Sequence, residues 1–518
     1  MNLFDAIFAH EATLPAVSYG HRHKTYGVLR SETLRMAHVL SELGTKPGDR
    51  VALLLNDSPE FVELFIAAVS LGAIVVPINI ALRLEDQYSI LANSGARFAF
   101  IEADLCSVLL TGAEEKLRGL EFVVLVERPE LGNAGQTGGK TRIRSLEALW
   151  QSAVEFKPAG FSTPGNEQPS LILYTSGSTG DPKGAVHRQA DIFYTNKTFC
   201  AEVLELTTSD RLFSSSRLPF AYGLGNSLSF PLLNGATTIL CREKPVPKVI
   251  ARILVEERPT IFFAVPVIYN LLLEYHRREQ PLDCSSLRLC ISAGEALPAR
   301  LGEEWEQTFA VKVLDGIGST EMQHMFLSNR ADRLRYGSSG VLVNGYEVRL
   351  VDDNGAPSLP GSEGHLWVKG ESAAMGYWQK PEESARTFVN GWVRTGDLYR
   401  QDSDGFWFHM GRSDDCFKSS GQWVSPVEVE GVLLRHAGVA RVAVVEDFDS
   451  DGLPCPCAFV VKEAIESNTQ KLEDELREMA GLSLPRFKQP RRYLFVDDLP
   501  YTATGKVQRF KLRQGLRH

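Results

Sequence analysis

The sequence predicts an α/β protein with a large N-terminal domain of parallel or mixed sheets and helices, a small β subdomain within it, and a small α+β C-terminal domain. Three observations support this fold class. Short β-branched runs alternate with helical patterns up to about residue 335. Short alternating segments between Gly-rich turns then follow. A compact α+β tail of about 100 residues ends the chain. We place the domain boundary between 1–413 and 414–518.

Residues 51–78 give the first motif in its simplest form. Val51 to Leu55 reads as a buried strand, and Ser58 is a favourable N-cap for a helix with Pro59 at its first position. Gly72 ends that helix, and Ala73 to Ile78 is the next strand. A strand, a crossover helix and a second strand form the parallel α/β unit. Further strands are expected at Phe98–Ile101, Phe122–Val126, Thr238–Leu240, Ile261–Val265 and Leu287–Ile291.

The later elements follow the same reasoning. Pro129 to Thr141 is rich in Gly and polar residues and is expected to be a surface loop. The antiparallel β region is expected at Glu347–Val351, His365–Val368 and Phe406–His409. The tail is expected to contain strands at Val439–Val445, Ala458–Val461 and Arg492–Val496, a turn at Asp449–Gly452, and a helix at Thr469–Ala480.

Composition restricts the class of protein. The chain has 518 residues, with 55 Lys and Arg against 64 Asp and Glu, for a net charge of −9. A mildly acidic chain has no global field that would concentrate it on nucleic acid or an anionic membrane. The eight cysteines contain no CxxC pair, and Met1 to Ala16 lacks the basic region of a signal peptide. We therefore expect a cytoplasmic protein with reduced thiols and neither nucleic acid nor membrane as a partner.

The strongest local signal is the run from Leu171 to Gly184. An apolar strand leads directly into hydroxyl residues, glycines and one lysine: Thr175, Ser176, Gly177, Ser178, Thr179, Gly180 and Lys183. Small residues let backbone N–H groups close on phosphate oxygens, hydroxyls add donors, and lysine adds a positive charge. Composition alone is equally consistent with a plain polar loop. The run is not a Walker A loop, because Gly184 follows Lys183 where Ser or Thr is needed.

The stretch from Tyr174 to Gly184 resembles the phosphate loop of the adenylate-forming superfamily, which contains acyl- and aryl-CoA ligases, carrier-protein adenylation domains and luciferases. The resemblance continues, in order, through Ser292–Pro298, Asp315–Glu321, Thr395–Asp397, Gly411–Asp415 and Pro500–Lys506. Two further blocks, Leu218–Asn226 and Met322–Phe326, most resemble the benzoate- and anthranilate-CoA ligase branch. The resemblance implies ATP, Mg²⁺ and CoA as cofactors or substrates.

The residues of these blocks suit the chemistry of adenylation. A carboxylate is already a nucleophile at neutral pH, so the site must mainly manage the charge of two anions that meet. Thr320 can donate to phosphate, Glu321 can hold Mg²⁺, and Asp397 can accept both ribose hydroxyls. By resemblance, Arg412 assists at the ribose, and the remaining ATP contacts are Ala293, Gly294, Glu295, Asp315 and Gly316. Without the resemblance, Asp397 and Arg412 read as a surface ion pair.

By resemblance, Lys506 is the catalytic lysine that bridges the incoming carboxylate and the α-phosphate. Asp414 occupies the hinge position, about which the mobile tail turns after adenylation. That turn removes Lys506 and brings in a face near Gly421, whose missing Cβ leaves room for a pantetheine arm. Basic residues near the last strand, Lys488, Arg491 and Arg492, are candidates for the CoA phosphates. Taken alone, each of these basic residues is equally consistent with a solvated surface position.

The acid pocket is also assigned by resemblance, to Ala221, Tyr222, Gly318, His324 and Met325. Small Ala221 and Gly318 would leave a flat slot, and a planar ring fits such a slot by stacking on aromatic faces. The polar edge of Tyr222 or His324 could accept an ortho amino or hydroxyl group, so 2-aminobenzoate stands beside benzoate as the substrate. The other interpretation of His324 is a histidine buried for packing.

These residues favour an AMP-forming acid–thiol ligase that converts a benzoate-type acid to its acyl-AMP and then to its CoA thioester. A stand-alone adenylation protein that loads a carrier protein shares the first half-reaction and remains the alternative. A non-catalytic binding protein is disfavoured, because Lys183, Thr320, Glu321 and Lys506 are all present. The expected partners are an aromatic acid, ATP and CoA, with a carrier protein or a homodimer left open.

Overall fold

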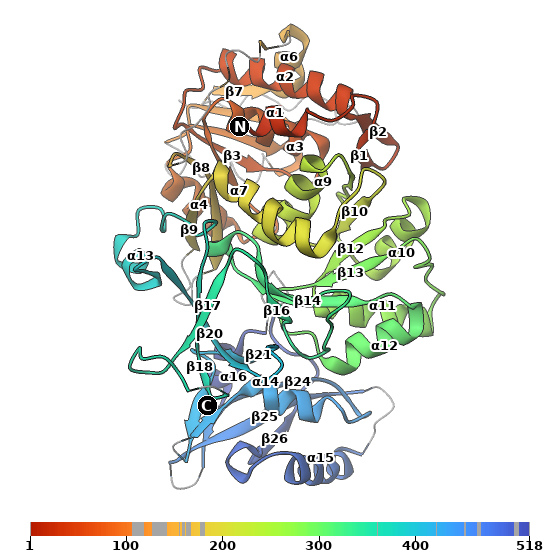
Figure 1. Cartoon of the computed structure of the whole chain (residues 1–518), viewed down its shortest axis with the longest axis vertical. Helices are drawn as coiled ribbons and strands as arrows, with labels where there is room; N and C mark the ends of the chain where they lie inside the picture. Colours follow the sequence, from red (N-terminus) through yellow and green to blue (C-terminus); the bar gives the residue numbers. More distant parts are fainter. Residues whose placement is uncertain are drawn as a thin grey trace.

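The computed structural model describes residues 2–105, 119–126, 142–154, 156–157, 161, 167–176, 182–359, 361–420, 422–449, 452–463, 468–501 and 507–516. The expected loop from Pro129 to Thr141 lies outside these residues. The N-terminal part contains two large sheets, and the C-terminal unit forms the end of the molecule opposite the N-terminus (Figure 1). The α/β fold class is therefore confirmed.

The first sheet has seven strands in the order β7-β6-β5-β3-β4-β8-β9. The strands are β3 (Arg50–Leu54), β4 (Ile74–Pro77), β5 (Phe98–Glu102), β6 (Phe122–Val126), β7 (Arg142–Ser145), β8 (Pro169–Ser176) and β9 (Pro182–Arg188). Its helices are α1 (Leu3–Ile7), α2 (Tyr26–Glu42), α3 (Pro59–Ser70), α4 (Leu84–Ser94) and α6 (Leu146–Ser152). Ser58 Oγ accepts from Phe61 N at 3.2 Å, so the predicted N-cap of α3 is confirmed.

The second sheet has nine strands in the order β16-β15-β14-β13-β12-β10-β11-β1-β2, and its central strands are parallel. They are β1 (Pro15–Tyr19), β2 (Arg22–Thr25), β10 (Arg211–Ser214), β11 (Thr237–Ile239), β12 (Ile261–Ala264), β13 (Leu289–Ser292), β14 (Val313–Gly318), β15 (Met325–Ser328) and β16 (Val341–Leu342). The accompanying helices are α7 (Gln189–Thr195), α8 (Ala221–Leu224), α9 (Phe230–Leu233), α10 (Pro247–Glu256), α11 (Pro266–Arg278) and α12 (Ala299–Phe309). Two π-helical segments, η2 (Asn196–Leu204) and η3 (Gly225–Ser229), and the 3₁₀ turn η4 (Thr320–Met322) adjoin them.

The predicted antiparallel β region forms a separate sheet. It contains β17 (Glu347–Val351), β18 (Glu363–Lys369), β19 (Phe388–Val389), β20 (Trp392–Gln401) and β21 (Trp407–Arg412), with α13 (Pro381–Thr387) beside it. All of its pairings are antiparallel, as expected. Its strand β21, which ends at Arg412, joins the segment before β16 of the second large sheet, because Trp407 N donates to Gly340 O at 2.9 Å.

The C-terminal unit has its own core. It comprises β22 (Phe417–Ser419), β23 (Gln422–Val424), α14 (Pro426–Leu433), β24 (Val439–Phe448), β25 (Pro454–Lys462), α15 (Thr469–Ser483), η5 (Arg486–Lys488), β26 (Arg492–Phe495) and α16 (Arg509–Gly515). Val444, Val460, Leu472 and Leu476 are each fully buried within one cluster of this unit. No helix in the described part of the chain is long and apolar enough to cross a bilayer. Seven of the eight cysteines are described, and all seven are free thiols.

Candidate active site

The hairpin of β8 and β9 presents the predicted phosphate loop. Thr175 pairs with Lys183 across the hairpin, which places both residues next to the tip. Gly177, Ser178, Thr179 and Gly180, and the side chain of Ser176, lie outside the described residues. Gly184 is required by close packing within the hairpin, because a Cβ there would lie 2.6 Å from Ile172 Cγ2.

Lys183, Tyr377 and Glu321 come together beside this hairpin. Residues 375–378 run along β9, where Met375 N donates to Val186 O at 2.9 Å and Val186 N donates to Gly376 O at 3.0 Å. Lys183 Nζ lies 5.6 Å from the centre of the Tyr377 ring, and Tyr377 Oη donates to Glu321 Oε1 at 2.6 Å. Burial raises the pKa of Tyr377, so its hydroxyl remains a donor. Sequence reasoning missed Tyr377, which lies outside the motif blocks.

Asp397 and Arg412 face each other as paired residues of β20 and β21. Arg412 Nη1 lies 3.3 Å from Asp397 Oδ1 and donates to Thr395 O at 2.8 Å. Burial alone would raise the pKa of Asp397, but His409 and Arg412 hold it below its ordinary value. Because Asp397 is only 7% exposed, the pair is not an ordinary surface ion pair. An ionised carboxylate that also has an arginine beside it suits the two hydroxyls of a ribose.

The loop after β13 was assigned to adenine. Ala293 is buried, whereas Gly294 is exposed and Glu295 is half-buried, so Gly294 and Glu295 are the ones that a ligand could reach. Asp315 lies behind this loop: its Oδ2 accepts from Leu297 N at 3.3 Å, and burial raises its pKa to about 8. Asp315 therefore supports the loop from the inside.

Gly316 and Gly318 allow the two strands of the β14–β15 hairpin to pack closely together. A Cβ at Gly316 would lie 2.4 Å from Leu327 O, and one at Gly318 would lie 2.5 Å from His324 O. The small size of Gly318 is expected to leave a thin slot for the ring of the acid. The hairpin supplies a second and independent reason, because its two strands approach too closely for any side chain at either position.

The predicted acid-pocket residues lie on α8, β14 and β15 and the loop between the two strands. Ala221 begins α8, and Tyr222 Oη donates to Ile291 O at 3.1 Å. The ring centres of Tyr222 and His324 are 5.6 Å apart. Met325 is 1% exposed in β15. These residues therefore come together, as the resemblance implied.

His324 is enclosed by residues that sequence reasoning did not assign. Its ring centre lies 4.7 Å from that of Phe199 and 4.6 Å from that of Phe230. Its Nε2 lies 3.1 Å from Asn226 Oδ1, and burial lowers its pKa to about 3. The neutral ring thus donates from Nε2, and its buried Nδ1 has no hydrogen-bond partner among the described residues. Asn226 fell within a motif block and could have been found there, whereas no sequence signal indicated Phe199.

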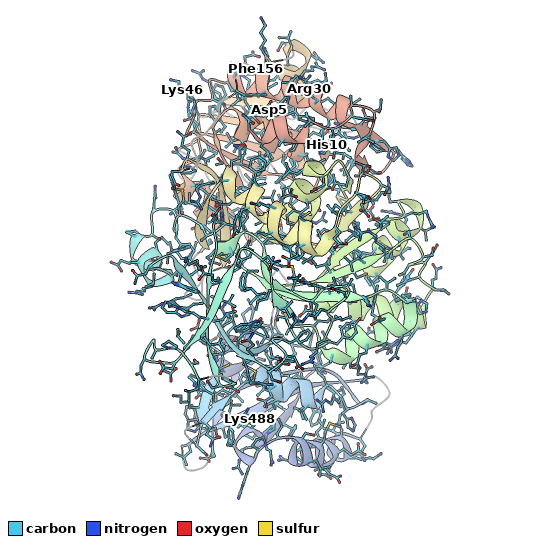
Figure 2. All side chains as sticks on the ribbon, viewed as in Figure 1. Asp5, His10, Arg30, Lys46, Phe156 and Lys488 are labelled. Carbon is cyan, nitrogen blue, oxygen red and sulfur yellow. The ribbon has the colours of Figure 1, made fainter. Side chains whose placement is uncertain are left out.

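The C-terminal candidates are less completely described. Gly421 and Lys506 lie outside the described residues, and Asp414 is exposed in the turn that follows β21. Lys488 lies in the C-terminal unit, far from Asp5 and Arg30 (Figure 2). Its Nζ is 2.5 Å from Glu428 Oε2, so its charge is already paired. Arg491 is exposed.

A cavity of 370 Å³ adjoins Lys488. It is lined by Glu363, Lys418, Gln422, Trp423, Phe487 and Lys488. The lining combines two lysines and two aromatic rings with the carboxylate of Glu363. This is the part of the described C-terminal unit closest in sequence to the expected thiol entry.

Family models and curated relatives match most of the chain. The AMP-binding enzyme family model matches residues 4–378, and the model of its C-terminal domain matches residues 428–506. Benzoate–CoA ligase of Thauera aromatica is 40% identical over 496 residues, which cover 94% of this chain and 90% of that protein. Anthranilate–CoA ligase of Pseudomonas aeruginosa is 35% identical and covers 99% of this chain and 96% of its own.

Solved structures show the same similarity in three dimensions. The anthranilate CoA ligase AuaEII in complex with anthranoyl-AMP superposes with a TM-score of 0.91 at 35% identity, over 100% of this chain and 97% of that one. A benzoate CoA ligase from Burkholderia xenovorans LB400 has a TM-score of 0.88 at 37% identity, over 99% and 100% of the two chains. The two domain models match successive parts of the chain, and both folds extend over nearly all of it. The chain therefore belongs to the AMP-binding enzyme family, the adenylate-forming superfamily that its motifs resemble.

Proposed function

We propose that the protein is an ATP-dependent aryl-CoA ligase. It activates a benzoate-type acid, either benzoate or 2-aminobenzoate, as the acyl-AMP and then transfers the acyl group to CoA. The observation that carries the proposal is that the aromatic rings of Tyr222 and His324 lie 5.6 Å apart, and that His324 follows the Thr320–Glu321 turn closely in the chain. Full-length similarity to benzoate– and anthranilate–CoA ligases supports it.

In the first half-reaction a carboxylate oxygen of the acid attacks the α-phosphorus of ATP. The new O–P bond forms as the bond to pyrophosphate breaks, and pyrophosphate leaves with its electron pair. Lys183, the hydroxyl of Thr320 and Lys506 are proposed to stabilise the charge that develops on the phosphates. Asp397 and Arg412 hold the ribose, and Gly294 and Glu295 line the adenine.

Mg²⁺ would be held by Glu321 together with phosphate oxygens of ATP. Among the described residues no group of three or more His, Cys, Asp or Glu side chains could hold a metal ion. One Glu321 oxygen accepts from Tyr377, which orients the carboxylate and leaves its other oxygen for a cation. An oxygen ligand of this kind fits Mg²⁺, which binds through few carboxylates and substrate phosphates. When bound, the ion would neutralise charge on the phosphates.

In the second half-reaction the thiol sulfur of CoA attacks the acyl carbon, AMP leaves, and the thiol proton passes to solvent. We propose that 1–413 and 414–518 act as separate domains and that rotation about Asp414 exchanges Lys506 for the Gly421 face. Arg491 is the more available of the proposed CoA phosphate contacts, because Lys488 would first have to leave Glu428. The acceptor is a small-molecule thiol, so no cysteine of the chain is required.

The proposal is tested with purified protein, ATP, Mg²⁺ and a panel of acids, with either CoA or a pantetheinyl carrier protein as acceptor. The panel contains benzoate, 2-aminobenzoate, hydroxybenzoates, phenylacetate, octanoate and cyclohexanecarboxylate, and mass spectrometry detects the thioester. We expect a benzoate to be the best acid and CoA the better acceptor. Faster turnover of octanoate or cyclohexanecarboxylate than of any benzoate would contradict the aryl pocket.

A variant adds a structural control to that panel. Ala221→Phe fills the pocket at the start of α8 and should lower kcat/KM for substituted benzoates by roughly 10- to 200-fold or more, the range of steric discrimination. ATP binding should persist, because the phosphate hairpin of β8 and β9 belongs to the other large sheet. Unchanged benzoate turnover in this variant would remove Ala221 from the pocket.

A further inference from the structure

A buried polar network lies behind the Thr320–Glu321 turn. Its centre is Asp191 in α7, which is fully buried, as is His187 at the end of β9. Asp191 Oδ2 accepts from His187 Nδ1 at 2.9 Å and from Arg188 N at 3.0 Å, and Asp191 Oδ1 accepts from Arg188 Nε at 2.9 Å. One carboxylate therefore organises both side chains, and α7 follows directly from the phosphate-loop hairpin.

Each of these two side chains reaches toward the turn. His187 Nε2 donates to Thr320 O at 2.7 Å. Arg188 Nη2 donates to Glu371 O at 2.7 Å and to Ala373 O at 3.1 Å. The next residue, Ala374, donates its N–H to Glu321 O at 2.8 Å. The backbones of Thr320 and Glu321 are thus both tied to Asp191, one directly through His187 and one through Arg188 and residues 371–374.

The two ring nitrogens of His187 determine which groups this network joins. One ring nitrogen of His187 faces the carboxylate of Asp191 and the other faces the main-chain carbonyl oxygen of Thr320. The ring therefore connects the carboxylate of Asp191 to the main chain of Thr320, so that the place of one fixes the place of the other. The turn itself is short, with three residues in η4 followed by Gln323 at φ +64°, and its internal main-chain hydrogen bonds, from Met322 N to Ser319 O and from Gln323 N to Thr320 O, are both 3.2 Å long.

We propose that Asp191 and His187 are positioning residues that hold the Thr320 hydroxyl and the Glu321 carboxylate in place for the phosphates of MgATP. The proposal rests on the proposed function, since it assigns ATP phosphates to this turn. Neither residue needs to touch the nucleotide. Loss of the carbonyl contact leaves a buried donor or acceptor unpaired and lets the turn shift, and a shift of that kind weakens the phosphate contacts.

The histidine offers a pair of variants of similar size that separate the two bonds. In His187→Asn the amide nitrogen takes the place of Nδ1, so the bond to Asp191 can persist while the bond to Thr320 O is lost. In His187→Gln the amide nitrogen reaches the place of Nε2 and can still donate to Thr320 O. Isothermal titration calorimetry with MgATP, without any acid, measures the effect on the phosphate site. Adenosine, which lacks the phosphates, is titrated in parallel.

The control carboxylate is Asp210, which is 3% exposed and accepts from Thr207 N, Thr260 Oγ1 and Arg288 Nε at 2.8, 2.6 and 2.8 Å. Its carboxylate accepts from three residues, whereas that of Asp191 accepts from two, and it belongs to the segment before β10. Asp191→Asn and Asp210→Asn thus both remove the charge of a buried carboxylate. Thermal unfolding of each variant records the general loss of stability.

We expect His187→Asn and Asp191→Asn to weaken MgATP binding by about tenfold, the loss that follows from one mispositioned charge-assisted contact. His187→Gln should lose clearly less, and all variants should bind adenosine like the wild type. Equal losses in His187→Asn and His187→Gln, or an equal loss in Asp210→Asn, would overturn the positioning role. Wild-type protein that binds no MgATP would instead overturn the proposed function on which it rests.

Discussion

The substitution Gly225→Ala tests the proposed acid pocket and leaves the proposed nucleotide site unchanged. Gly225 begins η3 with helical dihedral angles, φ −58° and ψ −56°, so alanine is compatible with its backbone. The effect must then come from the added methyl group. That group would lie 2.5 Å from His324 Cδ2, 2.9 Å from His324 Nε2 and 3.1 Å from Phe230 Cε2.

The expected loss in kcat/KM depends on how much space surrounds the ring of His324. A carbon–carbon contact of 2.5 Å is far below van der Waals distance, so the ring must retreat by at least about 0.5 Å. Phe199 and Phe230 enclose that ring at centroid distances of 4.7 and 4.6 Å, and Phe230 is itself crowded by the new methyl group. Overpacking of this kind costs about 1–3 kcal/mol, which corresponds to roughly 5- to 150-fold in kcat/KM for the aromatic acid.

Pyrophosphate release with saturating ATP measures kcat/KM for benzoate, and calorimetry measures ATP binding. Gly431→Ala is the matched control: Gly431 lies in α14, no atom comes within 4 Å of its added Cβ, and activity should be unchanged. The double variant Gly225→Ala/His324→Ala should lose no more than His324→Ala alone, because the ring that the methyl group meets is gone. Benzoate turnover equal to wild type in Gly225→Ala, or an equal loss of ATP affinity, would refute the reasoning.

Four further outcomes are expected. Lys506→Ala should slow adenylation by about 10²-fold or more, the scale of removing a preorganised charge, while thioester formation from preformed acyl-AMP changes little; equal losses in both half-reactions would refute its role. Asp414→Pro fixes φ near −65° and should trap one orientation of the tail, so that single-turnover assays show one half-reaction preserved and the other lost; equal slowing of both would reject the hinge. His324→Ala should lower turnover of 2-aminobenzoate or salicylate more than that of benzoate if the ring contacts an ortho substituent, and steady-state kinetics showing an equal fall for all three would leave His324 a packing residue. Burial raises the pKa of Asp315 to about 8, so the folded state binds a proton that the unfolded state has released, and the stability contributed by this group is lost as pH rises through that value. In thermal unfolding from pH 5 to 9, Asp315→Asn should therefore gain stability relative to wild type as pH rises. A constant difference in stability between the two proteins would contradict the raised pKa.

Much of the fold could be predicted from local patterns. The strand, helix and strand from Arg50 to Pro77 are marked by a β-branched run, the Ser58 cap, Pro59 and a terminating glycine, all of which act within a few residues. The antiparallel β region and the α+β tail were recognisable for the same reason. The ordered motif blocks also indicated Asp397, Arg412 and the acid-pocket residues, because each lies inside a contiguous stretch.

Other features depend on contacts between distant segments. Tyr377 reaches Glu321 across 56 positions, and Phe199 reaches His324 only because η2 packs beside the β14–β15 hairpin. Asp315 was assigned to the nucleotide from its motif, and its burial behind the loop that follows β13 became evident only in the fold. Lys488 was a candidate contact for the CoA phosphates, and only the fold shows that Glu428 already pairs with it.

The difference between the features that local sequence predicts and those that depend on distant contacts has a physical cause. Caps, turns and hydrophobic periodicity act over one turn of helix or a few residues of strand, so the amino-acid order alone determines them. Burial, pKa and hydrogen-bond partners depend on which surfaces meet when sheets and helices pack, and side chains separated by more than a hundred positions contribute to them. The link between His187 and Thr320 spans 133 positions and joins two motif-bearing segments through a main-chain carbonyl, which any residue would carry. Such a contact leaves no signature in the local sequence, and only the tertiary structure determines it.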